Sequence, residues 1–414
     1  MNPSGPIPSG PVVENLVLGG GLAGSMVAIH LAAAGRSVTL LEKERTPHHK
    51  VCGEFLSREA IVYLRQVGID PKELGAATIC FLRLSSKGRE FESTLPFSAL
   101  SLSRFTLDEA LLTRAKQSGC TVCRGVFVDR LSSNDCLWLA RLRGSDSQNL
   151  ESCSAQNVFL STGKHDLRGW ARAPVGRNDL VAFKLHWQLQ TAQTQALRDF
   201  MELFLFPGGY GGLSLVEGDA ANLCLVVRRA RLRAVGGWPA LLAAILEDNP
   251  LLRRRLHSAT PLWPRPLALS SIPYGHLSSH AAGLWRLGDQ AAVIPSFAGD
   301  GMSIALHSAA LAAETYLAGG GPEQFSRRLH DQLRPAMSLA VFVARLLLSG
   351  AGRTLAPAAL SFFPPALGWI ASQTRVPPHA CLSSPVMPPD RDLSSGAQPR
   401  NQGSGPRHLT RPSN

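Results

Sequence analysis

Three glycines near the N-terminus have the spacing of a phosphate-binding loop. Gly19, Gly21 and Gly24 form the pattern G-x-G-x-x-G between the apolar run VVENLVL and the segment LAGSMVAIHLAAAG, which is rich in small residues. In such a loop the first glycine permits a tight turn, the second lets the backbone approach a pyrophosphate, and the third lets helix and strand pack closely. With Leu22 and Ala23, these residues predict a site where the positive end of a helix faces phosphate groups.

An acidic residue follows at the end of the next apolar run. The segment SVTLLEKE predicts a second strand that ends at Glu42, with Lys43 beside it. A carboxylate roughly 20 residues past the last glycine accepts hydrogen bonds from ribose hydroxyls. Residues 12–42 therefore predict the strand, helix and strand of a dinucleotide-binding unit in a parallel α/β fold. This motif alone leaves FAD and NAD as alternatives.

Composition narrows the class of protein. The chain has 414 residues, 45% of them hydrophobic and 17% charged, so we expect a globular enzyme with more than one domain. The net charge of +12 comes partly from arginine runs at 228–233 and 253–255. No nucleic-acid motif accompanies these runs, so we interpret them as solvated surface and expect no nucleic acid as a partner.

Cysteine usage indicates the compartment. The eight cysteines are scattered, and the opening segment lacks the apolar core of a secretion signal, which predicts a cytoplasmic protein with reduced thiols. Cys120 and Cys123 form a lone C-x-x-C without a second pair or a histidine cluster, so no metal site is expected.

A second group of motif residues lies in the late segment LWRLGDQAAVIPSFAGDGMSIALHSAALAAE. Its Gly-Asp after a strand and its proline before a glycine pair resemble the group A flavoprotein monooxygenases and their geranylgeranyl reductase and halogenase relatives. The resemblance implies that Asp289 binds the ribityl chain of FAD and that the following helix points its N-terminus at the flavin ring. That helix end can stabilise negative charge on reduced flavin. The residues implied in cofactor binding are Gly288, Asp289, Pro295, Gly299, Asp300, Gly301 and Met302.

Two shorter stretches resemble other cofactor segments of the same family. LSRFTLDEALL resembles its Arg-x-x-Leu-Asp segment, which implies that Arg104 contacts FAD. STGKHDLRG retains Gly163 and Arg168 of a further segment but has Thr162 where the family has an aspartate. The resemblance therefore implies a contact to FAD from Gly163 only.

The reaction centre is implied by two more stretches. HKVCGEFLS resembles the Cys-Gly-Glu stretch of geranylgeranyl reductases, which places Cys52, Gly53 and Glu54 near the flavin. Cys52 then either acts on the substrate or fills space beside the isoalloxazine ring. MELFLFPGGYGG resembles an aromatic motif of the reductases, and the residues it implies as lining of an apolar substrate pocket are Phe204, Phe206 and Pro207.

The resemblance also implies an architecture. A Rossmann-type FAD-binding domain would be interleaved with an α+β substrate domain, as in p-hydroxybenzoate hydroxylase, and followed by a C-terminal helical segment. We expect the FAD-binding domain at residues 11–80, 101–170 and 275–335, the substrate domain at 81–100 and 171–274, and apolar helices at 336–375. Residues 1–10 and 376–414 are rich in Pro, Ser and Gly and are predicted to be disordered.

Two reactions remain open, and the first, a monooxygenase reaction, is the leading hypothesis. In the first, NAD(P)H reduces the flavin, oxygen forms a flavin C4a-hydroperoxide, and a hydrophobic aromatic or polyketide-like substrate is hydroxylated. In the second, the flavin delivers hydride to an isoprenoid carbon–carbon double bond and no oxygen is consumed. The Cys-Gly-Glu stretch and Asp300 favour the second, because hydroxylases usually have Gly-x-Gly-Met-Asn at the late glycine pair. A second G-x-G-x-x-G and the Trp-x-Trp-x-Ile-Pro motif of halogenases are missing from the sequence, which favours transient NAD(P)H binding and disfavours chlorination.

A non-enzymatic alternative is a dinucleotide-binding scaffold that docks on a membrane through its basic runs and C-terminal helices. The apolar segments AMSLAVFVARLLLSG and LAPAALSFFPPALGWIAS are interrupted by arginine and proline, so neither is predicted to span a bilayer. Peripheral contact of residues 337–371 with the inner face of the membrane is compatible with either enzyme. The sequence leaves the oligomeric state open.

Overall fold

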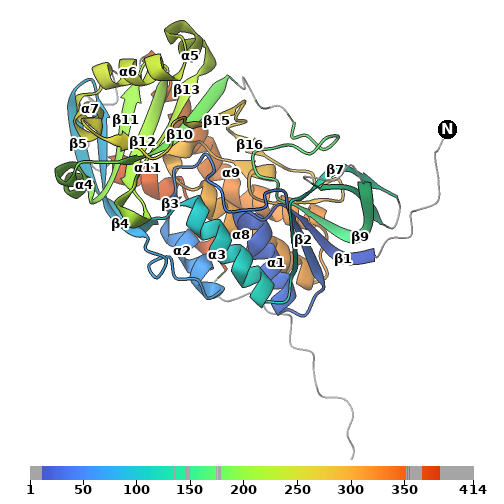
Figure 1. The fold of residues 1–414 in the computed structure, drawn as a ribbon. Helices are drawn as coiled ribbons and strands as arrows, with labels where there is room; N and C mark the ends of the chain where they lie inside the picture. The colour runs from blue at the N-terminus through green and yellow to red at the C-terminus, as the bar shows by residue number, and fades with distance from the viewer. Residues whose placement is uncertain are drawn as a thin grey trace, which may run out of the picture.

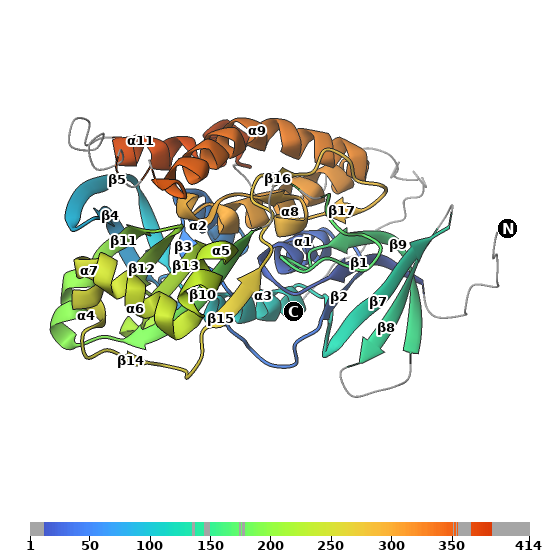
Figure 2. The ribbon, with the colours of Figure 1, turned by 90° about the horizontal axis from the view of Figure 1, so that it is seen from above.

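The described residues form two large β-sheets with helices between and beside them (Figure 1), and β16 (His276–Leu277) pairs with β18 (Ala292–Val293) in a small third sheet. The computed structural model describes residues 12–134, 137–144, 150–173, 175, 179–350, 352, 354 and 366–382. The segments predicted to be disordered, 1–10 and most of 376–414, lie outside the described residues. Turning the molecule shows the C-terminal helices α9 (Pro322–Leu347) and α11 (Ala366–Gln373) as a layer along one side (Figure 2).

The first sheet has at its centre the parallel strands that the glycine motif predicts. β1 (Val12–Leu18) pairs in parallel with β2 (Val38–Glu42) on one side and with β9 (Leu150–Leu160) on the other. The sheet is completed by β6 (Thr121–Arg124), β7 (Val126–Ser133), β8 (Trp138–Gly144) and β17 (Trp285–Arg286). β1 is apolar over consecutive residues because it is central and covered on both faces.

Helices from three distant parts of the chain cover this sheet. α1 (Leu22–Ala33) packs against α3 (Arg104–Gln117) and α8 (Gly301–Leu317), and α8 also packs against α2 (Arg58–Gln66). The contact between α1 and α8 is rich in alanine, which lets the two helix axes approach closely. Both glycine motifs are therefore held at one end of the same helical layer.

The second sheet has nine strands and carries helices on one face. Its strand order is β14-β10-β13-β12-β11-β4-β5-β3, and β15 also pairs with β10. The strands are β3 (Phe55–Leu56), β4 (Ala77–Ser86), β5 (Arg89–Ser101), β10 (Leu180–Gln188), β11 (Asp199–Phe206), β12 (Gly209–Leu215), β13 (Ala221–Arg228), β14 (Thr260–Pro261) and β15 (Leu267–Ser270). The helices are α4 (Thr191–Leu197), α5 (Arg229–Val235), α6 (Trp238–Asp248) and α7 (Pro250–Leu256). The segments expected to form the substrate domain thus share one sheet.

Strand β11 turns a different face to the cavity than the sequence predicts. Phe204 and Phe206 are buried in the core beneath α6 and α7, where they pack with Leu241 and Ile245. Alternate residues of a strand point to opposite faces, so Met201 and Leu203 face the other way, into the large cavity described below. The prediction that Phe204 and Phe206 line the substrate pocket is wrong, because it misjudged which face of β11 is turned to the cavity. Pro207, which follows the end of β11, does not line the cavity either.

The C-terminal part is more ordered than the sequence suggests. α9 (Pro322–Leu347) runs without interruption through Pro335, whose ring lies on the exposed side, so the domain boundary expected at 335/336 falls within a helix. α11 (Ala366–Gln373) follows, and the chain then enters the protein again: Val376 is fully buried. The backbone N–H of Leu382 donates to the Tyr63 hydroxyl at 3.1 Å. Disorder was therefore wrongly predicted for residues 376–382.

No helix among the described residues is long and apolar enough to cross a bilayer. α9 has the required length, but its apolar residues alternate with charged ones such as Arg334 and Arg345.

Candidate functional site

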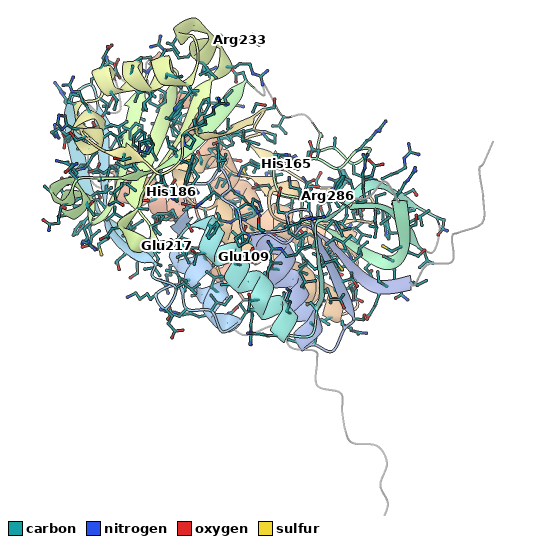
Figure 3. All side chains as sticks on the ribbon, viewed as in Figure 1. Glu109, His165, His186, Glu217, Arg233 and Arg286 are labelled. Atoms are coloured by element: carbon teal, nitrogen blue, oxygen red, sulfur yellow. The ribbon has the colours of Figure 1, made fainter. Side chains whose placement is uncertain are left out.

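A cavity of about 690 Å³ lies between the two sheets, and its walls include most of the predicted cofactor residues. Figure 3 shows the side chains of the molecule; of those labelled, His165, which follows β9, lines the cavity, and His186 belongs to β10 of the second sheet. The predicted residues that line the cavity are Gly19, Gly21, Leu22, Ala23, Glu42, Lys43, Cys52, Gly53, Arg104, Gly163, Gly288, Asp289, Gly299, Gly301 and Met302. The two motifs, almost 300 residues apart in sequence, therefore open into one space.

The early glycine loop leaves room for a ligand only at its middle position. A Cβ atom on Gly24 would lie 1.9 Å from the Gly19 carbonyl oxygen, so this glycine allows α1 to pack on β1. At Gly21 the nearest neighbours of a Cβ would be the Arg104 guanidinium at 3.3 Å and the Lys50 ammonium at 3.6 Å. The first turn of α1 has no side-chain cap, so its free N–H groups and these two cations face the same point.

The two cations are held by one carboxylate. Asp108 accepts from Arg104 at 2.7 Å and from Lys50 at 2.8 Å. Burial alone would raise the pKa of Asp108, but the charges of Arg104 and Lys50 outweigh it and lower the pKa. Burial would likewise lower the pKa of Arg104, and Asp108 raises it. Two fixed positive charges against one negative charge leave an excess positive charge beside Gly21, which suits a pyrophosphate.

The nucleotide end of the cavity is completed by β2 and β7. Glu42 is buried, and its two carboxylate oxygens accept from the backbone N–H groups of Gly20 at 2.8 Å and Glu44 at 2.9 Å. These bonds fix the carboxylate at the cavity wall, where each oxygen keeps a lone pair for a ribose hydroxyl. Val126 and Phe127 add an apolar surface next to it.

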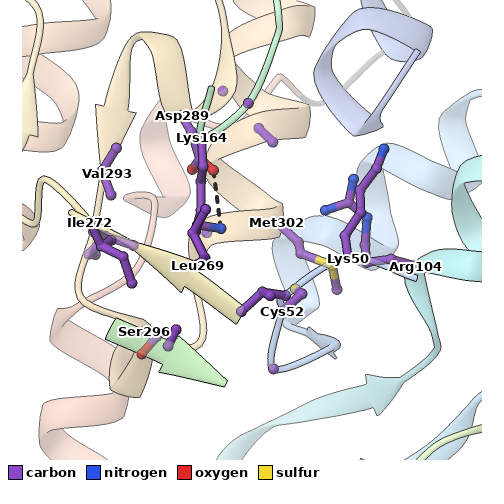
Figure 4. A pocket seen from close by; sticks show the side chains of 18 of the residues that line it. Lys50, Cys52, Arg104, Lys164, Leu269, Ile272, Asp289, Val293, Ser296 and Met302 are labelled. Carbon is purple, nitrogen blue, oxygen red and sulfur yellow. Dashed lines mark ion pairs between the residues drawn. The ribbon is translucent and has the colours of Figure 1, made fainter. Parts of the chain in front are cut away.

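The late motif adjoins the early glycine loop, since a Cβ atom on Gly288 would lie 3.2 Å from the Ala23 side chain. Asp289 pairs with Lys164 at 3.2 Å (Figure 4). Burial would lower the pKa of Lys164, but Asp289 and Cys52 outweigh this effect and raise it. The uncapped first turn of α8 begins at Gly301, next to Met302 in the cavity wall. A phosphate site, a ribose acceptor and a second helix N-terminus along one cavity match the successive parts of FAD, so the residues present fit this cofactor.

Three predicted cofactor residues do not reach the cavity wall. Gly24 lies behind the loop, and neither Pro295 nor Asp300 lines the cavity. The Asp300 carboxylate is fully buried and accepts from the backbone N–H of Val376 at 2.8 Å and from Arg375 at 3.3 Å. Burial raises its pKa to about 6. Asp300 was therefore wrongly predicted to bind FAD through its side chain; it anchors the C-terminal segment instead.

A buried charge cluster beside the Cys-Gly-Glu stretch was not predicted as part of the site. Glu54 is 0% exposed, accepts from the Lys184 ammonium, and bonds to His186 Nε2 at 2.8 Å and to the backbone N–H of Arg104 at 2.7 Å. Burial alone would raise the pKa of Glu54, but Lys184 and His186 outweigh it and lower the pKa. The only local signal was Glu54 itself, because its partners lie far along the chain.

The same cluster has some features of a metal site. Ligand atoms of His49, Glu54 and His186 lie within 4.8 Å of one another. The Lys184 ammonium bonds to the same carboxylate and places a positive charge where a cation would bind. The cluster therefore acts as an internal salt bridge that fixes the loop of Cys52.

Cys52 lies at the centre of the cavity wall. Its Sγ accepts from the backbone N–H of Glu54 at 3.3 Å, and its carbonyl accepts from Asn222 of β13 at 3.2 Å. Cys224 also lines the cavity, and burial raises its pKa to about 12. Cys52 is thus positioned by its own loop and by β13 of the second sheet, and it lines the cavity that fits FAD.

Three hydroxyl groups form a second polar cluster that sequence reasoning missed. Tyr274 donates to the Ser296 hydroxyl at 2.7 Å, and Tyr210 is 3.2 Å from the same oxygen. Ser296 follows β18 (Ala292–Val293) and precedes the glycine pair that leads into α8. Burial raises the pKa of both tyrosines, so their phenols stay protonated near neutral pH. The cluster lines the cavity beside Ile272 and Val293.

Comparison with known proteins agrees with this geometry. Residues 12–156 match the family described as FAD binding domain. The menaquinone reductase of Mycobacterium tuberculosis is 26% identical over 318 residues, which cover 72% of this chain and 75% of that protein. The chain is an FAD-dependent oxidoreductase.

Solved structures show that the chain shares its fold with an FAD-dependent halogenase and with a geranylgeranyl reductase-like protein. The myxobacterial chondrochloren halogenase CndH has a TM-score of 0.71 at 20% identity and covers 88% of this chain and 91% of its own. A geranylgeranyl bacteriochlorophyll reductase-like protein from Thermoplasma acidophilum has a TM-score of 0.68 at 17% identity, with 89% and 94% covered. These identities establish the fold and leave the reaction to be argued from the site.

We predict that Arg104→Gln weakens FAD binding to this oxidoreductase about ten- to a hundred-fold, since a charge-assisted hydrogen bond contributes about 1.5–3 kcal/mol. Titration of the FAD-free protein with FAD measures the dissociation constant. Arg124→Gln is the matched control, because Arg124 pairs with Glu109 outside the cavity wall. Equal FAD affinity in both variants would contradict the assignment of the phosphate site.

We predict that Glu54→Gln lowers the unfolding free energy near neutral pH by about 3–5 kcal/mol, because Lys184 is left buried without its counter-charge. The pKa of Glu54 is lowered from its ordinary value of 4.5, so its ionised form stabilises the fold above that pH and this contribution disappears as the pH falls below it. Urea unfolding across this range should show the gap between wild type and variant closing in acid. Glu92→Gln, at an exposed ion pair, should show a small gap at every pH; a gap of similar size in both variants refutes the argument.

Proposed function

We propose that the protein reduces a carbon–carbon double bond in a long, apolar, isoprenoid-like substrate, with NAD(P)H as the source of electrons. The observation that carries this proposal is the junction of an aliphatic chamber with the Tyr210, Ser296 and Tyr274 hydroxyl cluster, inside the cavity that fits FAD. The chamber supplies affinity for an apolar chain, and the cluster supplies a proton.

The aliphatic chamber lies between the second sheet and the C-terminal helices. Its walls come from β4, β5 and β11 on one side and from α9 and α11 on the other. The lining residues are Leu82, Leu84, Leu95, Met201, Leu203, Val343, Leu347, Leu367, Ile370 and Ala371. Burial of apolar surface contributes about 25 cal/mol per Å², so a chamber with these walls favours a hydrocarbon chain over a polar substrate.

The hydroxyl cluster is arranged to move one proton towards the chamber. Tyr274, which is partly exposed, donates to Ser296. When Ser296 in turn donates to Tyr210, the Tyr210 proton is free to point into the cavity. When Tyr210 gives up that proton, Ser296 passes a proton to Tyr210 and Tyr274 passes one to Ser296. No buried charge therefore persists.

Atoms and electrons balance with one hydride and one proton. FAD held beside Gly21 and Arg104 would supply the hydride, with electrons that come from NAD(P)H, and one carbon of the double bond receives it. Tyr210 gives its proton to the other carbon, and the relay takes up a replacement proton from solvent. The oxidised product is NAD(P)⁺, and the saturated chain stays in the chamber until release. Cys52 and Gly53 close the cavity wall and exclude water.

The menaquinone reductases of Mycobacterium tuberculosis and Mycolicibacterium smegmatis, each 26% identical to this chain, support a reduction of a lipid-like compound. A second candidate is the hydroxylation of an apolar aromatic or polyketide-like compound by a monooxygenase. It is favoured by the same hydroxyl cluster, because Tyr210 can also accept a proton from a phenolic substrate, and by the fold shared with halogenases. Both candidates require FAD and differ in their need for oxygen.

The decisive experiment incubates the FAD-loaded protein and NADPH with menaquinone, with geranylgeraniol and with a long-chain alkylphenol, each in air and under nitrogen. Mass spectrometry of the extracted lipid identifies the product. We expect one of the two isoprenoid compounds to gain two hydrogens in both atmospheres. Oxygen-dependent gain of one oxygen atom by the alkylphenol, with no change in the isoprenoids, would replace the reductase with the monooxygenase.

We predict that Tyr210→Phe slows substrate turnover about a hundred-fold or more, the usual contribution of a positioned proton donor, while NADPH still reduces the flavin at the wild-type rate. Stopped-flow absorbance follows flavin reduction, and product analysis follows turnover. Tyr316→Phe is the matched control, since its hydroxyl bonds to Glu14 outside the cavity. Turnover by Tyr210→Phe at the control's rate would show that the proton comes from another group.

A further inference from the structure

Large apolar side chains are exposed on the C-terminal helical layer. Phe342 is 66% exposed, Trp369 is 55% exposed and Leu346 is 38% exposed. Phe342 and Leu346 are four residues apart on α9 and so share one face of that helix. Trp369 lies on α11, and the two helices meet in one hydrophobic cluster, where Leu347 and Leu367 pack. Figure 2 shows both helices along the same side of the molecule.

The opposite faces of these helices line the aliphatic chamber. Val343 and Leu347 of α9 and Leu367 and Ile370 of α11 are in the cavity wall. A single layer of helices therefore has apolar side chains on both sides, one towards the chamber and one towards the outside. An ordinary surface helix has one apolar face only.

From residue 332 onward, the charge of α9 and α11 has one sign. No aspartate or glutamate occurs between residues 332 and 389 of the sequence, whereas four arginines do. Arg334 and Arg345 are exposed on α9, next to the exposed apolar residues. Exposed aromatic and aliphatic side chains bordered only by arginines match the two layers of an anionic lipid surface, acyl chains below and negatively charged head groups above.

We infer that the outer face of α9 and α11 docks the protein on an anionic lipid bilayer. Phe342, Leu346 and Trp369 enter the boundary between head groups and acyl chains, and Arg334 and Arg345 contact the head groups. The docking is peripheral, because no helix among the described residues can span the membrane. Docking at this face explains why the longest stretch of the sequence without aspartate or glutamate, residues 332–389, includes the helices that form the outer wall of the chamber.

Docking at this face gives an apolar substrate a short route. A chain dissolved in the bilayer reaches the chamber by passing between α9 and α11 and need not cross water. This route rests on the proposed function, whereas the docking itself is independent of any reaction. A failure of the reductase assay therefore leaves the docking experiment unaffected.

The test is flotation of the FAD-loaded protein with vesicles of phosphatidylcholine alone or with phosphatidylglycerol added at about a third of the lipid. We expect the protein to float with the anionic vesicles, less with the neutral ones, and less at high salt, because surface charge is screened. Protein that stays at the bottom of the gradient with both kinds of vesicle would overturn the inference.

Variants separate the apolar and charged contributions. The double variant Phe342→Ser, Trp369→Ser should lower vesicle partitioning at least about ten-fold, since each side chain loses its apolar burial. Arg345→Gln should lower partitioning to anionic vesicles about five-fold and leave neutral vesicles unaffected. Leu262→Ser is the control, because Leu262 is 48% exposed and directly follows β14, on the side opposite α9 in Figure 2.

All variants should retain bound FAD and its reduction by NADPH, which shows that they are folded. Wild-type partitioning by the double variant would overturn the assignment of this face. Equal losses in Leu262→Ser and in the double variant would do the same, because binding would then not be specific to α9 and α11.

Discussion

The buried carboxylate of Glu54 joins parts of the molecule that no continuous strand connects. Lys184 and His186 reach it from β10 of the second sheet, and the backbone N–H of Arg104 reaches it from the start of α3. Its own carbonyl oxygen accepts from Ser101 at the end of β5. Glu54 adopts a left-handed backbone, φ 59°, a strained conformation that persists only where surrounding contacts over-determine it. The position of the adjoining Cys52 and Gly53 in the cavity wall depends on this one residue.

The phosphate site depends on the same junction. Because Glu54 accepts from the backbone N–H of Arg104, it fixes the first turn of α3 and thereby the direction of the Arg104 side chain towards Gly21. Asp108, one turn further along, then sets the distance between Arg104 and Lys50. The reaction centre and the anion site are therefore coupled through backbone geometry, and a ligand at one end stabilises the conformation that the other end needs.

The features that the sequence predicts well are local ones. The turn at Gly19, the close approach at Gly24 and the start of α8 at Gly301 each follow from a few neighbouring residues, because backbone conformation and helix ends are set locally. The orientation of β11 is not local. Whether Leu203 or Phe204 faces the cavity depends on pairing with β4 and β12, and a shift of one residue exchanges the two faces. Phe204 and Phe206 indicated that this segment is a strand, but not which of its faces is turned to the cavity.

Charged partners far apart in sequence account for the other differences between the sequence predictions and the structure. Lys184 is 130 residues from Glu54, and Val376 is 76 residues from Asp300, so neither contact has a local signature. Residues 376–382 begin a C-terminal stretch whose overall composition predicts disorder, and they are ordered because the fold provides buried acceptors for their backbone, Asp300 and Tyr63. Composition predicts whether a segment is ordered in the absence of partners. Here the segment has a partner, the Asp300 carboxylate, which belongs to the glycine pair that the sequence assigned to the cofactor.

The C-terminal anchor also explains the position of the helical layer. α11 leads directly into Thr374 and Arg375, which are buried beside Asp300 at the start of α8. Arg375 also stacks on Phe97 of β5, 4.3 Å from the ring centre, so one residue links α8, α11 and the second sheet. The wall of the aliphatic chamber is thereby tied to the helix that begins at the flavin end of the cavity. Movement of α11 that opened the chamber would strain this contact, so access to the chamber and order at the N-terminus of α8 are physically linked.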